Sequence, residues 1–313
     1  MSILLDCNNG LGGDTMDGVI PLNKPKGMTS HDCVNRIRRL LKTKKVGHTG
    51  TLDPDAEGVL PICVGKATKI ASLLTGQTKE YVAEISLGTL TTTEDHSGEI
   101  VKKEAVSSTL EIETCEDILS KFLGTIEQTP PMYSAVKVNG KKLYEYAREG
   151  IVIERPSREI QIHSIKMLSN EITWYNDYDV RFRFKVSCSS GTYIRTLCVD
   201  IGQGLGFPAH MSDLKRTKVG NFDLKDTYTF QDLETALNND DLPFINMADA
   251  LTIPSLYVTD EEAKRYHHGQ VLDQPDNQCY SSLFKVVDES NHLIAIYQAH
   301  PSKRGKVKPF KVF

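Results

Sequence analysis

Residues 180–188, VRFRFKVSC, constrain the fold of this chain more than any other segment. Apolar and polar side chains alternate there without a break, which is the pattern of a strand with one buried face. Residues 80–88 alternate in the same way. A Ser-Ser-Gly break and an amphipathic helix follow residue 188. Because strands and helices are mixed without a regular strand–helix–strand rhythm, we expect an α+β fold rather than a doubly wound parallel sheet.

Two further segments carry local structural signals. Residues 29–42, TSHDCVNRIRRLLK, predict a helix, because Thr29 and Asp32 can form a capping box ahead of an apolar stripe at helical spacing. Asn139 and Gly140 are a turn signal between a strand and a short helix.

The pattern of the chain changes after the acidic, Asn-rich stretch at residues 237–243. A short helix, two strands and a basic tail follow, and we interpret these as a small β-rich domain. We therefore expect a disordered Gly/Asn-rich extension at residues 1–16, a catalytic domain at 17–250 and a C-terminal domain at 251–313. That last domain is a candidate RNA-binding module, although the lysines of residues 303–311 could equally be a solvated end.

Charge and cysteine content narrow the class of protein. The net charge is −4, yet basic residues cluster at 36–45, at 215–218 and in the tail, as in a protein that holds a polyanion at one face. Seven scattered cysteines without a CxxC pair or zinc spacing indicate reduced thiols in the cytoplasm. The GQGLG at residues 202–206 does not follow a strand and there is no Walker motif, so no cofactor is predicted.

The stretch GHTGTLDPDAEGVLP, residues 47–61, places three acids directly after the first basic run. Asp53 precedes a proline and could begin a helix, but Gly58 follows so soon that an ordered loop is the better interpretation. A carboxylate kept among basic residues can act as a nucleophile or a general base. Asp55 and Glu57 are weaker candidates that we expect to face solvent. A glycosidase-like pair of carboxylates also remains open at this point.

The same stretch resembles the signature of the TruB family of tRNA pseudouridine synthases, and the resemblance extends in register over about residues 17–225. The other segments that carry it are residues 18–32, 79–88, 91–98, 128–150, 188–202 and 206–222. It implies a pseudouridine synthase fold with a central mixed, mostly antiparallel sheet and a PUA-like C-terminal domain. It also implies isomerisation of one uridine to pseudouridine at position 55 in the T-loop of tRNA. That reaction flips the base and needs no cofactor or metal. The partner implied is the T-arm stem-loop, and we expect a monomer.

The resemblance assigns a catalytic role to three residues. Asp53 matches the catalytic aspartate, and Arg195 matches the arginine that pairs with it. A guanidinium there would keep the carboxylate ionised and oriented. Tyr81 matches the tyrosine that stacks on the target base. From the residues alone, Arg195 could be a surface arginine and Tyr81 a core tyrosine.

Six further residues match positions that the resemblance associates with RNA binding. His48 resembles a histidine that helps to extrude the T-loop nucleotide. Lys24 could contact a phosphate or steady the loop. The remaining matches are two cavity-lining candidates and two candidate phosphate contacts: Tyr193, Leu214, Lys215 and Arg216.

Two rival functions use the same residues. A non-catalytic RNA-binding or RNA-folding protein would use the basic surface without needing Asp53. A nucleoside or glycoside hydrolase would use Asp53 with a second carboxylate and would release free base.

Overall fold

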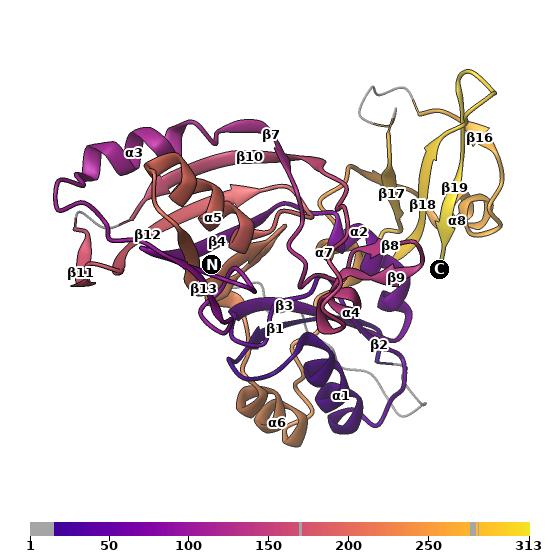
Figure 1. Cartoon of the computed structure of the whole chain (residues 1–313). Coiled ribbons are helices and arrows are strands. Elements are labelled where there is room, and N and C mark those ends of the chain that lie inside the picture. The colour runs from indigo at the N-terminus through magenta and orange to yellow at the C-terminus, as the bar shows by residue number, and fades with distance from the viewer. Residues whose placement is uncertain (1–15, 169–170, 276–279, 281) are drawn as a thin grey trace.

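The computed structural model describes residues 16–168, 171–275, 280 and 282–313 (Figure 1). The disordered extension expected over residues 1–16 therefore lies, apart from Met16, outside the described residues. No helix in these ranges is long and apolar enough to cross a membrane. The described cysteines are all buried and are not in disulfides: Cys33, Cys63, Cys115, Cys188 and Cys198.

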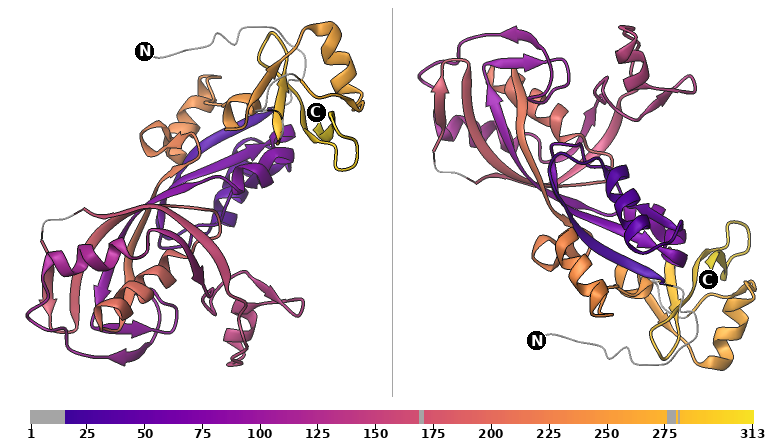
Figure 2. Two further views of the ribbon diagram at one scale, coloured as in Figure 1. Left: turned by 90° about the horizontal axis from the view of Figure 1, so that it is seen from above. Right: turned by 90° about the horizontal axis from the view of Figure 1, so that it is seen from below.

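A mixed sheet, with ten strands among the described residues, forms the body of the protein (Figures 1 and 2). Its main path runs β1 (Gly18–Lys24), β3 (Glu57–Val64), β13 (Ala209–Val219), β4 (Lys79–Leu87), β12 (Asp179–Cys188), β10 (Arg158–Met167) and β7 (Gly124–Gln128). Three short strands pair at its sides: β2 (Val46–His48), β11 (Thr173–Asn176) and β14 (Phe222–Asp223). Along the main path only β3 and β13 pair in parallel. The expected α+β fold with a mostly antiparallel sheet is confirmed.

The two strands with the clearest alternation lie side by side in this sheet. β12 pairs with β4 over its length, and in both strands alternate side chains are buried. Their buried side packs against α3 (Ile112–Ser120) and α5 (Ile194–Leu205) in one apolar cluster. The period-2 pattern therefore predicted both the strands and the face that forms the core.

The helix predicted at residues 29–42 is α1 (Ser30–Leu40), and its capping box is present. The backbone N–H of Asp32 donates to Thr29 Oγ1 at 3.0 Å, and the backbone N–H of Thr29 donates to Asp32 Oδ2 at 2.9 Å. α1 and α6 (Phe230–Asn238) pack on β1 and β3 around a second apolar cluster. Four short elements complete the body: η1 (Gly65–Ile70), α2 (Ala71–Thr75), η2 (Leu224–Asp226) and α7 (Met247–Ala250).

Residues 49–58, which we call the Asp53 loop, form an ordered segment without a helix, as predicted, and its last two residues begin β3. A single turn closes it, in which Ala56 N–H donates to Asp53 O at 3.1 Å. Gly58 has a φ of +110°, and a Cβ atom there would lie 2.2 Å from the backbone oxygen of Arg216. Only glycine therefore lets β3 approach β13 where the loop enters the sheet.

Two hairpins extend from the body. β5 (Thr89–Thr91) and β6 (Ile100–Lys103) form one, and the loop between them carries residues 92–99. β8 (Lys137–Val138), β9 (Lys141–Lys142) and α4 (Leu143–Arg148) form the other, which stands away from the main sheet (Figure 2). Asn139 and Gly140 turn it with φ values of +52° and +82°, so the predicted turn is confirmed.

A five-stranded sheet follows the body, in the order β15 (Ser255–Tyr257), β17 (Phe284–Val287), β18 (Leu293–Ala299), β19 (Lys306–Val312), β16 (Leu272–Asp273). α8 (Asp260–His267) packs on it. The basic tail is more ordered than expected, because residues 306–312 pair with strands on both sides as β19 and Val307 is fully buried. Val287, Leu293 and Ile296 share an apolar cluster with Val19 and Val59 of the body.

Candidate active site

A cavity of about 800 Å³ opens beside the Asp53 loop. Its other walls include β13, the start of β4, the loop between β5 and β6, the segment from Tyr133 to the α4 hairpin, and the N-terminus of α5. Asp53, Tyr81, Tyr193, Arg195, Leu214 and Arg216 line it. The structure thus brings six of the nine predicted site residues to one cavity.

Arg195 contacts three of the segments that form this cavity. It stands in the first turn of α5 with its side chain 7% exposed, and its Nε lies 3.0 Å from Asp53 Oδ2. The same guanidinium donates to Thr93 O and to Tyr133 O, both at 2.9 Å. Arg195 therefore ties the Asp53 loop to two other walls of the cavity and fixes the direction of the carboxylate.

The carboxylates on either side of Arg195 differ in proton affinity. Burial raises the pKa of Asp53 above its ordinary value, and the opposing effect of Arg195 does not cancel it. Burial acts in the same direction on Asp95, which lies 3.8 Å from Arg195 Nη1. There, however, hydrogen bonds from Ser97 and Thr93 outweigh burial and lower the pKa. Arg195 orients Asp53 and favours its ionised form, but burial has the larger effect on the pKa of that carboxyl.

Tyr81 and Leu214 form an apolar part of the wall. Tyr81 is 6% exposed and Leu214 is 6% exposed, on the adjacent strands β4 and β13. Tyr81 lies opposite Arg216 in the register of these strands. Burial raises the pKa of the Tyr81 phenol, so it is neutral at physiological pH. A neutral aromatic ring at the wall is suited to contact with a flat, apolar ligand face.

Lys24 and Arg216 support the loop from below instead of reaching outward. Lys24 is completely buried, and its ammonium donates to Pro54 O at 3.1 Å and to Ala56 O at 2.6 Å. Arg216, 1% exposed, donates from Nε to Val59 O at 2.7 Å and from Nη2 to Gly50 O at 3.2 Å. The donors of both cations are used by the loop and residues beside it in this structure, so neither is free to bind a phosphate. This corrects the expectation that Arg216 contacts a phosphate. Of the two roles expected for Lys24, it favours support of the loop over contact with a phosphate.

The other three predicted RNA-binding residues differ in where they lie. His48 ends β2, where its Nδ1 accepts from Gly50 N–H at 3.3 Å, and burial lowers its pKa. Lys215 is 40% exposed and pairs with Glu57 at 3.0 Å. Neither residue lines the cavity. Tyr193 does, with the Arg158 guanidinium 5.0 Å above its ring.

Asp55 and Glu57 are the weaker candidates of this loop. Asp55 also lines the cavity, but its side chain is 53% exposed, and its nearest basic partner is His96 at 3.8 Å. Glu57 is committed to Lys215 and does not line the cavity. Of the three acids of this loop, only Asp53 pairs with Arg195.

Our reading of the residues did not single out Asp95, Lys79, Tyr133, Ser134 or Arg158, which all line the cavity. All of these except Arg158 lie in segments that carried the family resemblance, at residues 79–88, 91–98 and 128–150. The signal that could have found them was the match of these segments to the family, in the same order along the chain. Spacing alone could not have found these residues, because they reach the cavity from separate strands and loops.

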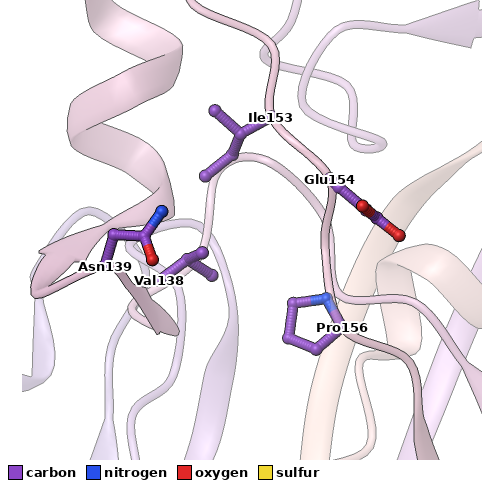
Figure 3. Close-up of a pocket in the computed structure, with 5 residues that line it drawn as sticks. All are labelled: Val138, Asn139, Ile153, Glu154 and Pro156. Carbon is purple, nitrogen blue, oxygen red and sulfur yellow. The ribbon is translucent and has the colours of Figure 1, made fainter.

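A second cavity of about 380 Å³ lies beside the α4 hairpin (Figure 3). Val138, Asn139, Ile153, Glu154 and Pro156 line it. Glu154 is the one ionisable side chain in that lining, so the cavity offers no pair of groups for acid–base or nucleophilic chemistry. Within the described ranges, no group of three or more His, Cys, Asp or Glu residues is placed to hold a metal ion.

Comparison with known proteins identifies the family of the chain. Residues 38–194 match the model of the TruB family pseudouridylate synthase N-terminal domain, and residues 195–247 match the tRNA pseudouridylate synthase B C-terminal domain. The tRNA pseudouridine synthase B of Bacillus cytotoxicus is 51% identical over 300 residues, covering 95% of this chain and 97% of that protein. That of Halalkalibacterium halodurans is 51% identical over 302 residues, with the same coverage.

Solved structures give the same result for the fold. A chain from a Cbf5–Nop10–Gar1 complex superposes with a TM-score of 0.72 at 29% identity, covering 95% of this chain and 85% of that one. A chain from an H/ACA ribonucleoprotein bound to a substrate RNA containing 2′-deoxyuridine superposes with a TM-score of 0.71 at 26% identity. It covers 96% of this chain and 86% of that one.

Proposed function

The chain belongs to the TruB family of pseudouridine synthases, isomerases that act on tRNA, and on that premise we propose that it converts uridine 55 of the T-loop to pseudouridine with Asp53 as the catalytic carboxylate. The observation that carries the assignment is the Asp53–Arg195 pair, 3.0 Å apart, at the wall of an 800 Å³ cavity. Cavities of this size accept ligands as large as a nucleotide.

The proposed reaction balances within one nucleotide. The N1–C1′ bond of uridine breaks, the uracil turns, and C5 bonds to C1′. The C5 hydrogen leaves as a proton, and N1, released from C1′, takes up a proton. Asp53 acts as a nucleophile toward C1′ or C6, or transfers a proton during formation of a glycal. Arg195 holds the carboxylate in one orientation for any of these steps. No electron acceptor or group donor enters the balance.

The target base must leave the loop of the RNA to reach Asp53. Flipping a nucleotide costs a few kcal/mol, which stacking in the cavity can offset. We assign that stacking role to Tyr81, since its neutral ring lies at the wall. Tyr193 and Leu214 extend the same wall. We assign contacts with the entering RNA strand to His48, at the end of β2, and to Lys215 on β13, whose side chain is 40% exposed.

Lys24 and Arg216 take a positioning role in this proposal. Both hydrogen-bond backbone carbonyls of the Asp53 loop or its junction with β3 from buried positions. They thereby hold the loop that carries Asp53 without touching the substrate. We propose residues 251–313 as the PUA-like RNA-binding domain, with exposed Lys303 and Arg304 beside β19 as candidate contacts.

Tritium release from uracil C5 tests the function directly. A T-arm stem-loop RNA labelled at C5 is incubated with the wild type and with Asp53→Asn. We expect release by the wild type alone and retained RNA binding by both, because the amide keeps the shape of the carboxylate but not its charge. Normal release by Asp53→Asn would refute the catalytic assignment. Appearance of free uracil would identify a hydrolase, and RNA binding without release by either protein would favour a non-catalytic RNA-binding protein.

A further inference from the structure

The cavity holds more positive charge than its own acids neutralise. Six basic side chains line it, and Arg195 and His96 have carboxylate partners. Among the residues that the structure describes, the other four form no ion pair with a carboxylate: Lys79, Arg148, Arg158 and Arg216. Two of these, Lys79 at 6% and Arg216 at 1% exposed, are buried as well. A buried cation without an acid is costly unless a ligand or hydrogen bonds compensate it.

Lys79 has a donor to spare. It is the first residue of β4, two positions before Tyr81, so both side chains lie on the same side of the strand. Its Nζ donates to Thr75 O and to Gln77 O, each at 2.8 Å. An ammonium has three N–H groups, so these bonds leave one. Thr75 lines the same cavity, which places the ammonium at the cavity wall.

Lys79 and Arg216 converge on Gly50 of the Asp53 loop. A Cβ atom built on Gly50 would lie 3.5 Å from Lys79 Cε and 3.8 Å from Arg216 Nη1. The hydrogen bonds of Arg216 go to the Val59, Thr51 and Gly50 carbonyls and to the Tyr81 side chain. Its charge therefore adds to the local positive potential while its donors are committed. An anion that approaches Gly50 meets two cations and one open N–H group.

We propose that Lys79 binds a phosphodiester oxygen of the RNA strand beside the target uridine, a role that deepens the proposed function and rests on it. Gly50 and Asp53 are three residues apart, and that length of extended chain spans at most about 11 Å. A phosphate at Gly50 thus belongs to a nucleotide in the cavity or next to it. Lys79 sets the register of the strand, while Arg195 orients Asp53.

A scan of neutral linkages tests this assignment. T-arm stem-loop RNAs, each with one phosphodiester replaced by a methylphosphonate, are bound to Asp53→Asn protein so that no turnover intervenes. We expect one linkage flanking the target uridine to weaken binding about tenfold when Lys79 is present. In Lys79→Met the same replacement has no further effect, and the slope of log affinity against log salt falls by about 0.7.

Lys66→Met is the matched control, since Lys66 is 57% exposed and pairs with Asp17 outside the cavity. It should leave the linkage profile unchanged, and Lys79→Arg should restore the salt slope. The proposal is overturned if Lys79→Met weakens binding but stays equally sensitive to that linkage, as a contact with uracil or a structural role would predict. If Lys79→Met does not fold, the linkage scan on Asp53→Asn protein that keeps Lys79 is sufficient. If binding is insensitive to replacement of every linkage that flanks the target uridine, the proposal is overturned. Tritium release by wild-type protein on unmodified RNA reports separately on the proposed function.

Discussion

The Asp53 loop and the junction between the body and the C-terminal sheet are both held by buried cations that bind backbone carbonyls. Beneath the loop, Lys24 reaches Pro54 O and Ala56 O, and Arg216 reaches Val59 O. At the junction, Lys285 donates to Ala248 O and, at 2.8 Å, to Leu251 O. In both places one cation replaces several hydrogen bonds that a loop cannot form with itself.

We call these two sets of contacts the loop clamp, made by Lys24 and Arg216, and the junction clamp, made by Lys285. Their surroundings differ. The Asp53 loop faces the cavity and presents a carboxylate to it, whereas Ala248 and Leu251 pack in the apolar cluster that the body shares with β17 and β18. Burial lowers the pKa of Lys24 and of Lys285 alike. A buried lysine is therefore no sign of an active site by itself. What distinguishes the functional clamp is that the backbone it holds carries Asp53.

The largest effect expected on the loop side is that of Arg195→Met. Arg195 joins Asp53 to Thr93 O and Tyr133 O, so its loss frees the carboxylate and leaves two carbonyls without their donor. Removing a preorganised donor of this kind lowers kcat by about 100- to 1,000-fold. Single-turnover tritium release measures the loss. Arg195→Lys should recover little, since an ammonium cannot span three acceptors in the fork of a guanidinium. Recovery of most activity in Arg195→Lys would contradict the idea that activity depends on all three contacts of the guanidinium.

Gly58→Ala should be the most destabilising change in the loop. Its Cβ atom would lie 2.2 Å from the backbone of Arg216, so β3 and β13 must separate at their parallel pairing. We expect a loss of about 3 kcal/mol in the free energy of unfolding. Urea denaturation measures it. Gly150→Ala is the control, because Gly150 also has a positive φ, of +70°, but open space around its Cα. Gly150→Ala should lower the free energy of unfolding by only about 1–2 kcal/mol. If the two variants lose the same stability, the positive φ alone, and not the contact with Arg216, explains the loss at Gly58.

The two lysine clamps can be compared with the same substitution. Lys24→Met and Lys285→Met each leave buried carbonyls without a donor, so both should lower the free energy of unfolding by about 1–3 kcal/mol. Only Lys24→Met should also lower kcat/KM, by about tenfold, since only that clamp positions Asp53. Urea denaturation and tritium release on both variants give the comparison. An equal loss of activity in Lys285→Met would mean that the junction also controls the site.

The smallest expected effect is one of pH on RNA binding. Burial, followed by the charge of Arg216, lowers the pKa of Lys79 to about 8, and the thiol of Cys188 on β12 acts in the opposite direction. A lysine that binds phosphate loses its charge above that pH, so the affinity for T-arm RNA should fall by up to about tenfold as pH rises through 8. Lys79→Arg should stay level over the same range.

The titration of Lys79 should change the stability of the fold in the opposite direction: RNA affinity falls as pH rises, whereas stability increases. The folded-state pKa of Lys79 lies below its unfolded value of 10.5, so the charged amine destabilises the folded state at neutral pH. That penalty is relieved as pH rises from about 8 toward 10.5. Lys285 should contribute to stability in the same direction without affecting RNA affinity. Parallel affinity and unfolding titrations test whether the loop and the junction differ in this way.

The sequence predicted those parts of the fold whose signal is local. The alternation of β4 and β12, the capping box of Thr29 and the turn at Asn139 were all confirmed. The position of Asp53 beside Arg195 came from the family resemblance, because 142 residues separate them.

The parts that could not be predicted depend on contacts distant in the chain. β13 carries two bulges, between Met211 and Asp213 and between Arg216 and Lys218. They interrupt its alternation, so nothing local shows that Arg216 points inward. The same holds for β19, whose basic sequence left an RNA contact and a solvated end equally open and whose order comes from its neighbours β16 and β18.

The bond from Arg216 to Val59 O has a consequence for synthesis on the ribosome. It joins residues 157 positions apart, so the Asp53 loop leaves the exit tunnel long before its clamp exists. At a translation rate of roughly 5–20 residues per second, the nascent loop waits about 8–30 s for β13. Truncated or stalled chains that end before β13 therefore display Asp53 on an unsupported loop, and the active site becomes available only after most of the chain has emerged.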